Sequence, residues 1–186
     1  NSNGYFTIKL DKNLNSERHI LMSSDSEFSA ETVQIKAKGL EYMNNITKAW
    51  IPIKEVISKE GDNSADDYIA YTFFIKNDGK ENVSYKTKIV IESVIKNVDE
   101  AVRVAVYFNG KESVYAKKAK DGSPEPQTIP FISNHLIMQQ DRNDIKPGEI
   151  DRYSIVVWLE GNDPECIDDI IGGEMKMAMV ITEKTK

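Results

Sequence analysis

The residues best suited to chemistry lie in an acidic segment, residues 158–171, that follows a strongly apolar stretch of the chain. Its five carboxylates are Glu160, Asp163, Glu165, Asp168 and Asp169. Carboxylate oxygens at this density could hold Ca²⁺, although their spacing matches no EF-hand loop. Capping of a helix start by Asp163, together with a solvated acidic face, explains the same residues. We favour this structural interpretation, so no tightly bound metal is expected, and Ca²⁺ is the one cofactor that these residues would suit.

The remaining polar residues match no known catalytic pattern. His19 and His135 lie far apart in the sequence, and neither has a zinc-binding spacing such as His-Glu-x-x-His. The chain contains no Gly-x-Ser-x-Gly elbow, no Gly-rich phosphate loop with Lys and no dinucleotide fingerprint. A second acidic group precedes an aromatic stretch and receives the same structural interpretation: Asp62, Asn63, Asp66 and Asp67. We therefore assign no catalytic or cofactor-binding residue and do not predict an enzyme.

The sulfur-containing residues also favour structural roles. Cys166 is the only cysteine, so the chain cannot form an internal disulfide. A helix start at Cys166 would favour the thiolate, whereas its acidic neighbours would oppose it, and we expect the neighbours to prevail. Met175, Met177 and Met179 recur at strand spacing, which favours packing in a core over copper binding or a redox role.

Alternation of apolar and polar residues, the signature of half-buried strands, is the dominant pattern in the chain. Residues 83–91 alternate in this way, and residues 102–108 and 111–116 flank Asn109-Gly110, a pair typical of type I′ hairpin turns. We expect residues 83–91 and 102–116 to form adjacent antiparallel strands with four buried side chains: Ile89, Ile91, Val104 and Val106. Further strands are predicted over residues 5–10, 32–37, 68–76, 152–159 and 174–182.

Two short helices are predicted between these strands. Residues 52–60 begin with a proline suited to a first helical turn and are followed by Gly61. Residues 163–171 begin with Asp163 and Pro164 and are followed by Gly172-Gly173. Turns are expected at residues 77–79 and 146–149, and surface loops at residues 13–28 and 117–127.

These elements predict one all-β domain over residues 1–186, an antiparallel β-sandwich or jelly roll with one or two short helices. A net charge of −6 and a pI near 5.1 argue against nucleic-acid binding, which requires a clustered basic surface. No apolar run reaches the length of a membrane-spanning helix, and the first residues do not resemble a signal segment.

Three stretches resemble secreted proteins of Gram-positive bacteria related to TasA and camelysin. They are YTFFIKNDG at residues 71–79, the Pro147-Gly148 turn, and YSIVVWLEGNDPEC at residues 153–166. The resemblance covers roughly residues 68–182 and implies an extracellular jelly-roll protein whose leader is removed by a dedicated signal peptidase. In the best-known relatives it implies a building block of matrix fibres. Camelysin-like members have been classed as metallopeptidases, but no zinc-protease motif occurs in this chain.

We therefore expect a secreted or cell-surface structural or interaction protein, a subunit of biofilm-matrix fibres. Residues 5–10 alternate cleanly, and a terminal strand can pair with its own sheet or with a neighbouring copy or related matrix protein. Head-to-tail donation of such a strand would produce filaments. A metal-dependent hydrolase and an extracellular ligand-binding module for glycans or peptides remain open alternatives.

Overall fold

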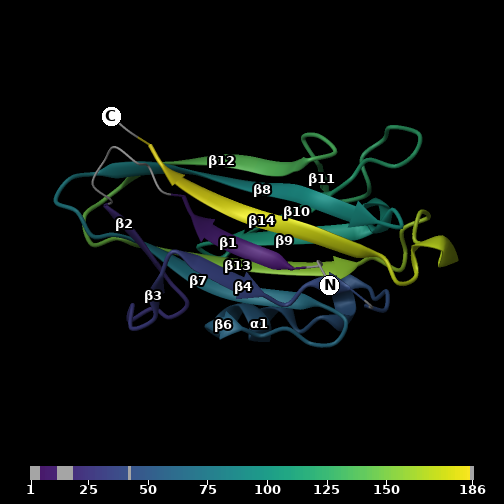
Figure 1. Ribbon diagram of the computed structural model, residues 1–186, viewed down its shortest axis with the longest axis horizontal. Helices are drawn as coiled ribbons and strands as arrows, with labels where there is room; N and C mark the ends of the chain where they lie inside the picture. The colour runs from purple at the N-terminus through teal and green to yellow at the C-terminus, as the bar shows by residue number, and fades with distance from the viewer. Residues whose placement is uncertain (1–4, 12–18, 42, 185–186) are drawn as a thin grey trace.

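The computed structural model describes residues 5–11, 19–41 and 43–184, which form two β-sheets packed face to face (Figure 1). The first sheet has the order β12 (Leu136–Ile145), β8 (Val83–Ile95), β14 (Glu174–Glu183), β1 (Phe6–Leu10) and β4 (Gln34–Ala37), with β5 (Leu40–Glu41) also on β14. The second has the order β11 (Ile129–Pro130), β10 (Lys111–Ala116), β9 (Val102–Phe108), β13 (Ile150–Leu159), β7 (Ile69–Asn77), β2 (Ile20–Ser23) and β3 (Glu31–Thr32), with β6 (Gly61–Asp62) on β7. The predicted all-β sandwich is confirmed.

Among the named strands of the described residues, the pairing is antiparallel apart from two places. β1 runs parallel to β14, and the two-residue strand β11 runs parallel to the end of β10. Both sheets are therefore mixed. The parallel pair places the first described strand directly beside the last one.

The main core lies between the sheets, where alternate residues of each strand face inward. Met175, Met177 and Met179 on β14 are fully buried there, which confirms their predicted role in packing. Phe6 and Ile8 on β1 are buried beside them. Burying such side chains contributes roughly 1.5–3 kcal/mol each relative to exposure.

A second, smaller core covers the outer face of the second sheet. The helix α1 (Ile53–Ser58) and the 3-10 turn η1 (Lys48–Trp50) belong to the segment that packs there. Val56 of α1 joins a cluster with Val156 and Trp158 of β13. This cover explains why β7 and β13 are apolar on both faces rather than alternating. The predicted helix over residues 52–60 is confirmed as α1.

The predicted hairpin is confirmed, but its predicted neighbour is wrong. Phe108 pairs with Lys111 around Asn109 and Gly110, which have φ values of 48° and 85°, as a type I′ turn requires. β8 pairs with β12 and β14 in the first sheet, whereas β9 lies in the second sheet. The 3-10 turn η2 (Val98–Glu100) connects them across the sandwich, following a left-handed backbone at Lys96 and Asn97. The four named side chains are nevertheless buried, because both strands face one core: Ile89, Ile91, Val104 and Val106.

Other sequence-based boundaries also change. The loop expected over residues 13–28 contains β2, while residues 12–18 lie outside the described part of the chain. The strand expected over residues 32–37 is broken at Val33, because β3 pairs with β2 in the second sheet and β4 pairs with β1 in the first. The helix expected over residues 163–171 is wrong. Turns replace it, followed by the 3-10 turn η3 (Asp168–Ile170).

Within the described ranges, the helices are too short to cross a bilayer.

Candidate functional site

Strand β1 occupies an internal slot of the first sheet. It is paired on one side with β14, from Phe6↔Met177 to Leu10↔Ile181, and on the other with β4, from Phe6↔Ala37 to Lys9↔Gln34. Phe6, Ile8 and Leu10 point into the core and are at most 5% exposed. A strand only five residues long therefore fills an internal position in its sheet.

Strand β4 depends on β1 for its place in the first sheet, since β1 is the only strand among the described residues with which it pairs. The amide of Leu10 donates to the carbonyl of Val33 at 2.9 Å, which extends the ladder beyond β4. In the alternation of an antiparallel ladder this makes Thr7 and Lys36 a non-hydrogen-bonded pair, whose side chains are close. Removing β1 would leave β14 with an open edge and β4 without a partner.

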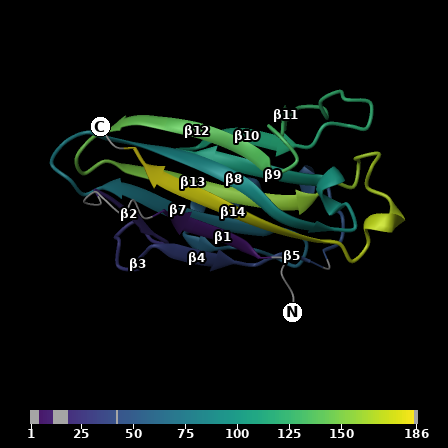
Figure 2. The same ribbon diagram turned by 45° about the horizontal axis from the view of Figure 1, so that its top comes forward.

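A carboxylate cluster lies between the β10–β11 and β13–β14 connections. These two connections project from the same end of the sandwich (Figure 2). Glu125, Asp163 and Glu165 each offer an oxygen there, and these oxygens lie within 4.8 Å of one another. All three residues are buried, with exposures of 5%, 4% and 9%. We refer to these three residues as the carboxylate cluster.

Backbone turns position each member of the carboxylate cluster. The Asp163 carboxylate accepts the Glu165 amide at 2.8 Å, and its carbonyl accepts the Cys166 amide at 2.9 Å. The Glu165 carboxylate accepts the Lys120 amide at 3.1 Å, which ties the acidic segment to the other loop. The carbonyl of Glu125 accepts both the amide and the hydroxyl of Thr128.

Arg103 on β9 contacts the carboxylate cluster from the outer face of the second sheet. Its guanidinium donates to Asp163 at 2.8 Å and lies 3.9 Å from the Glu125 carboxylate. Burial, and then the charge of Asp163, raise the pKa of Glu125 to about 6, although Arg103 opposes this shift. The same arginine therefore supplies positive charge to two of the three acids.

The structure divides the five acidic residues that the sequence singles out. Asp163 and Glu165 belong to the carboxylate cluster, so the expected solvated acidic face is wrong for them. Glu160 instead accepts hydrogen bonds from the Trp158 indole and the Asn162 amide, both at 3.2 Å. Asp168 and Asp169 are exposed on η3. Asp163 does cap a turn through the Glu165 amide, but no helix follows it.

Sequence reasoning missed Glu125 and Arg103. Glu125 lies in the loop expected over residues 117–127, which forms no helix or strand but folds back onto the acidic segment. The sequence signal for Glu125 is weak, because a glutamate among Ser, Pro and Gln is usually solvated. Arg103 interrupts the apolar strand of residues 102–108, and such a charge in a buried strand requires a partner.

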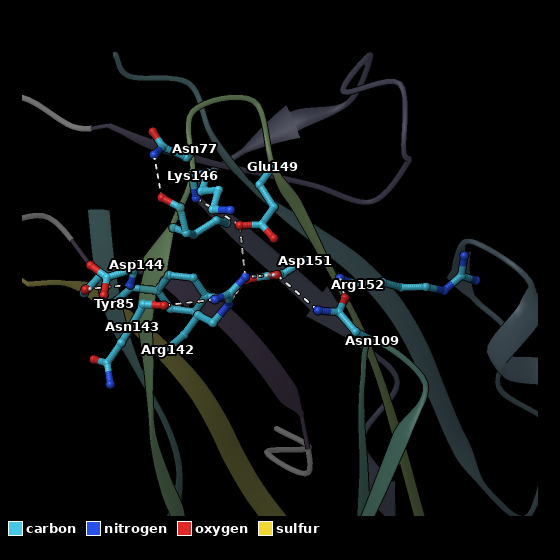
Figure 3. Close-up of polar contacts among 12 residues, drawn as sticks. Asn77, Tyr85, Asn109, Arg142, Asn143, Asp144, Lys146, Glu149, Asp151 and Arg152 are labelled. Carbon is cyan, nitrogen blue, oxygen red and sulfur yellow. Dashed lines mark hydrogen bonds and ion pairs between the residues drawn. The ribbon is translucent and has the colours of Figure 1, made fainter. Parts of the chain in front are cut away.

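A second buried polar network lies beside the β7–β8 and β12–β13 turns (Figure 3). These turns are at the opposite end of the sandwich from the β13–β14 connection (Figure 2). Asp151 is fully buried and accepts two hydrogen bonds from Arg142, at 2.9 and 3.0 Å. Tyr85 donates to the same carboxylate at 2.6 Å and Asn109 at 3.2 Å. Its one buried negative charge thus has a bidentate guanidinium and two further donors.

A pocket of about 200 Å³ opens between β10 and the edge strand β12. Phe108, Tyr115 and Met138 supply part of its apolar lining, and Gln140 and Arg142 part of its polar lining. Its volume is below the roughly 300–1,000 Å³ typical of small-molecule sites.

The other residues considered from sequence have local structural contacts. The backbone amide and ring of His19 both contact the Glu183 carboxylate at 2.9 Å, whereas His135 is exposed. The Asp62 carboxylate accepts the backbone amide of Ser64, and the Asp67 carboxylate accepts the side-chain amide of Asn44. The Cys166 thiol is half-buried and accepts a hydrogen bond from Asn45 at 3.3 Å.

Comparison with known proteins gives little further information. No protein-family model and no curated protein matches the chain. A crystal structure of a β-glucosidase from Kluyveromyces marxianus is similar over 90% of this chain and 17% of its own, with 10% identity and a TM-score of 0.31. The chain thus spans less than a fifth of that protein. A similarity this low supports no inference about fold or function.

Proposed function

We propose that this protein is a structural subunit that polymerises by strand exchange, with β1 of one copy entering the first sheet of the next. The observation that carries the proposal is the place of β1: a strand near the N-terminal end of the sequence, paired on both sides and anchored by three buried side chains. The ladder and the apolar slot can be satisfied equally by the same strand from another copy.

Exchange of this kind conserves the native contacts, so its equilibrium depends on chain geometry and concentration rather than on new interactions. Each copy has one β1 to donate and one slot between β14 and β4 to fill. A donor and its slot are different surfaces, which makes the contact heterologous, and a heterologous contact that does not close yields a filament. The expected product is therefore a fibre with one strand exchanged at each junction.

The cellular setting of the proposal comes from the sequence resemblance to the TasA and camelysin group. That resemblance supports a secreted or cell-surface location and a role in a biofilm matrix, with copies of this chain or a related matrix protein as partners. The metal-dependent hydrolase is less favoured. In the described residues, the group of possible metal ligands consists of three carboxylates and contains neither histidine.

Intermolecular disulfide trapping tests the proposal directly. Thr7→Cys and Lys36→Cys are made in separate chains, each with Cys166→Ser, and the two proteins are mixed under assembly conditions and oxidised. Thr7 and Lys36 are a non-hydrogen-bonded pair, so their replacements are close enough to form a disulfide across the ladder. We expect a crosslinked dimer of the two chains.

A matched control separates strand exchange from random collision. Thr7→Cys is mixed with Gln140→Cys, which is exposed on the distant edge strand β12, and this mixture should crosslink poorly. A chain carrying both Thr7→Cys and Lys36→Cys should remain monomeric when oxidised and assemble when reduced. Equal crosslinking in both mixtures, or fibres formed by the oxidised double variant, would show that β1 is not exchanged.

A further inference from the structure

We propose that Glu125, Asp163 and Glu165 bind one divalent cation of Ca²⁺-like chemistry and that this ion fastens the β10–β11 connection to the β13–β14 connection. The proposal is independent of strand exchange, because β1 contributes no residue to the carboxylate cluster. It rests on unpaired buried oxygens, on charge and on the spacing of the donors.

Two oxygens of the carboxylate cluster are buried without a hydrogen-bond partner. They are Oε1 of Glu125 and Oε2 of Glu165. Both side chains are more than nine-tenths buried, and both belong to the group whose ligand oxygens converge within 4.8 Å. Leaving a buried polar atom unpaired costs about 1–3 kcal/mol, and more when the group is charged. Two such oxygens on residues of one carboxylate cluster indicate a missing positively charged partner.

The charges point the same way. Within the described residues, the three carboxylates have one cation at ion-pair distance, Arg103, so two negative charges are uncompensated whenever all three carboxylates are ionised. The nearby Lys117 pairs instead with Asp99 and Glu100. At the opposite end of the sandwich, Asp151 is fully compensated by Arg142 and neutral donors. A divalent ion would neutralise the excess at the carboxylate cluster.

The type of the ligand atoms, carboxylate oxygens, and their spacing favour Ca²⁺ over other common metals. Ca²⁺ binds carboxylate oxygens at about 2.3–2.6 Å, so two ligands on opposite sides of one ion lie about 5 Å apart. The 4.8 Å limit on the separations in the cluster fits this span. Zn²⁺ prefers histidine and thiolate ligands, and Mg²⁺ retains several waters within a strict octahedron. Backbone oxygens or water would complete the coordination.

An ion at this position would act as a clamp. Without the ion, the two connections are joined near the cluster by the hydrogen bond from the Lys120 backbone amide to the Glu165 carboxylate. With it, Glu125 from one connection and Asp163 and Glu165 from the other coordinate the same ion. We expect bound Ca²⁺ to protect residues 117–127 from proteolysis and to raise the melting temperature.

The test uses the full chain, freed of metal with a chelator, and measures thermal melting and calorimetric titration with Ca²⁺. The wild-type protein should melt several degrees higher in excess Ca²⁺ and bind one ion per chain. Glu125→Gln should weaken binding by at least about tenfold, by analogy with losses at other metal sites. Asp168→Asn removes an exposed carboxylate from the same segment and should leave the response unchanged.

The behaviour in chelator distinguishes a ligand from a merely structural residue. Glu125→Gln removes like-charge repulsion, so it should melt at or above the metal-free wild type while losing the response to Ca²⁺. Glu165→Gln provides a second variant if Glu125→Gln does not fold. No melting shift or binding heat of the wild type with Ca²⁺, Mg²⁺ or Mn²⁺, or an undiminished response of Glu125→Gln, would overturn the proposal.

Discussion

Asp151 and Glu149 both contact Arg142, yet their burial gives them different energetic weights. Asp151 is fully buried and holds Arg142 through two hydrogen bonds, whereas the Glu149 side chain is 41% exposed and 3.2 Å from the same guanidinium. Asp151→Ala should lower the free energy of unfolding by about 3 kcal/mol, at the lower end for a broken buried pair because Arg142 can still reach Glu149. Urea denaturation measures this loss.

Glu149→Ala is the matched control for that measurement. It removes a partly exposed contact to the same arginine and should cost about 0.5 kcal/mol, as surface ion pairs do. Similar losses in the two variants would mean that burial does not set the value of the Arg142 contacts.

Position 173 requires glycine because a side chain would not fit there, not because of its backbone conformation. A Cβ atom at this position would lie 2.8 Å from the Ile95 carbonyl and 2.9 Å from both the Ile170 carbonyl and the Val98 side chain. Two of these neighbours are backbone atoms that cannot turn aside, so Gly173→Ala should cost about 2 kcal/mol. Gly161→Ala meets nothing closer than Asn45 at 3.5 Å and should change the unfolding free energy by less than about 0.5 kcal/mol. Equal melting temperatures for the two variants would contradict this account.

At the residue scale, sequence patterns predicted burial better than they predicted polar partners. The alternation of Met175, Met177 and Met179 was sufficient to place them in the core, because strand geometry fixes which side chains share a face. The acidic segment looked uniform, and only the fold separates buried Asp163 and Glu165 from exposed Asp168. The third member, Glu125, comes from a loop far away in the sequence, and no local pattern could indicate that contact.

At the element scale, local signals were reliable and connections between sheets were not. Asn109-Gly110 specifies a hairpin because both residues accept positive φ. The path from β8 to β9 depends on η2 and on left-handed Lys96 and Asn97, residues that give no strong turn signal. β12 was missed because its sequence is largely polar, as suits an edge strand with one exposed face.

Tyr85 on β8 and Tyr153 on β13 join the two sheets through their hydroxyls, which lie 2.7 Å apart. Burial first, and then the neighbouring Tyr153 and Asp151, raise the pKa of Tyr85 well above its ordinary value. The stability that Tyr85 contributes is therefore present below the ordinary tyrosine pKa of about 10 and is lost as pH rises beyond it. In an alkaline titration followed by tyrosinate absorbance, Tyr85 should ionise only as the protein unfolds.

Tyr85→Phe identifies that step in the titration. The variant should lose part of the absorbance change that coincides with unfolding, while the change that precedes unfolding stays the same. If the change that precedes unfolding shrinks instead, Tyr85 ionises in the folded protein and the inter-sheet link is weaker than its burial implies.

At the scale of the whole molecule, the sandwich class followed from composition and alternation, but the order of strands did not. Nothing in the sequence of residues 5–10 indicates an internal position parallel to the last strand, since parallel pairing of β1 and β14 is a contact across most of the chain. That placement makes β1 important for assembly. Loss of an edge strand breaks one hydrogen-bond ladder, whereas loss of β1 breaks two, those with β14 and β4.

A free peptide with the sequence of residues 3–11 should therefore cap the proposed fibres. It carries the three buried anchors of β1 but no sandwich of its own, so a copy whose slot holds the peptide can no longer accept a neighbour's strand. We expect the mean fibre length in electron micrographs to fall as peptide is added. A peptide with Ile8→Asp, which would bury an unpaired charge, should have no effect. A chain lacking residues 1–10 should bind the native peptide yet form no fibres. Fibres formed by that truncated chain without peptide would show that assembly uses a different surface.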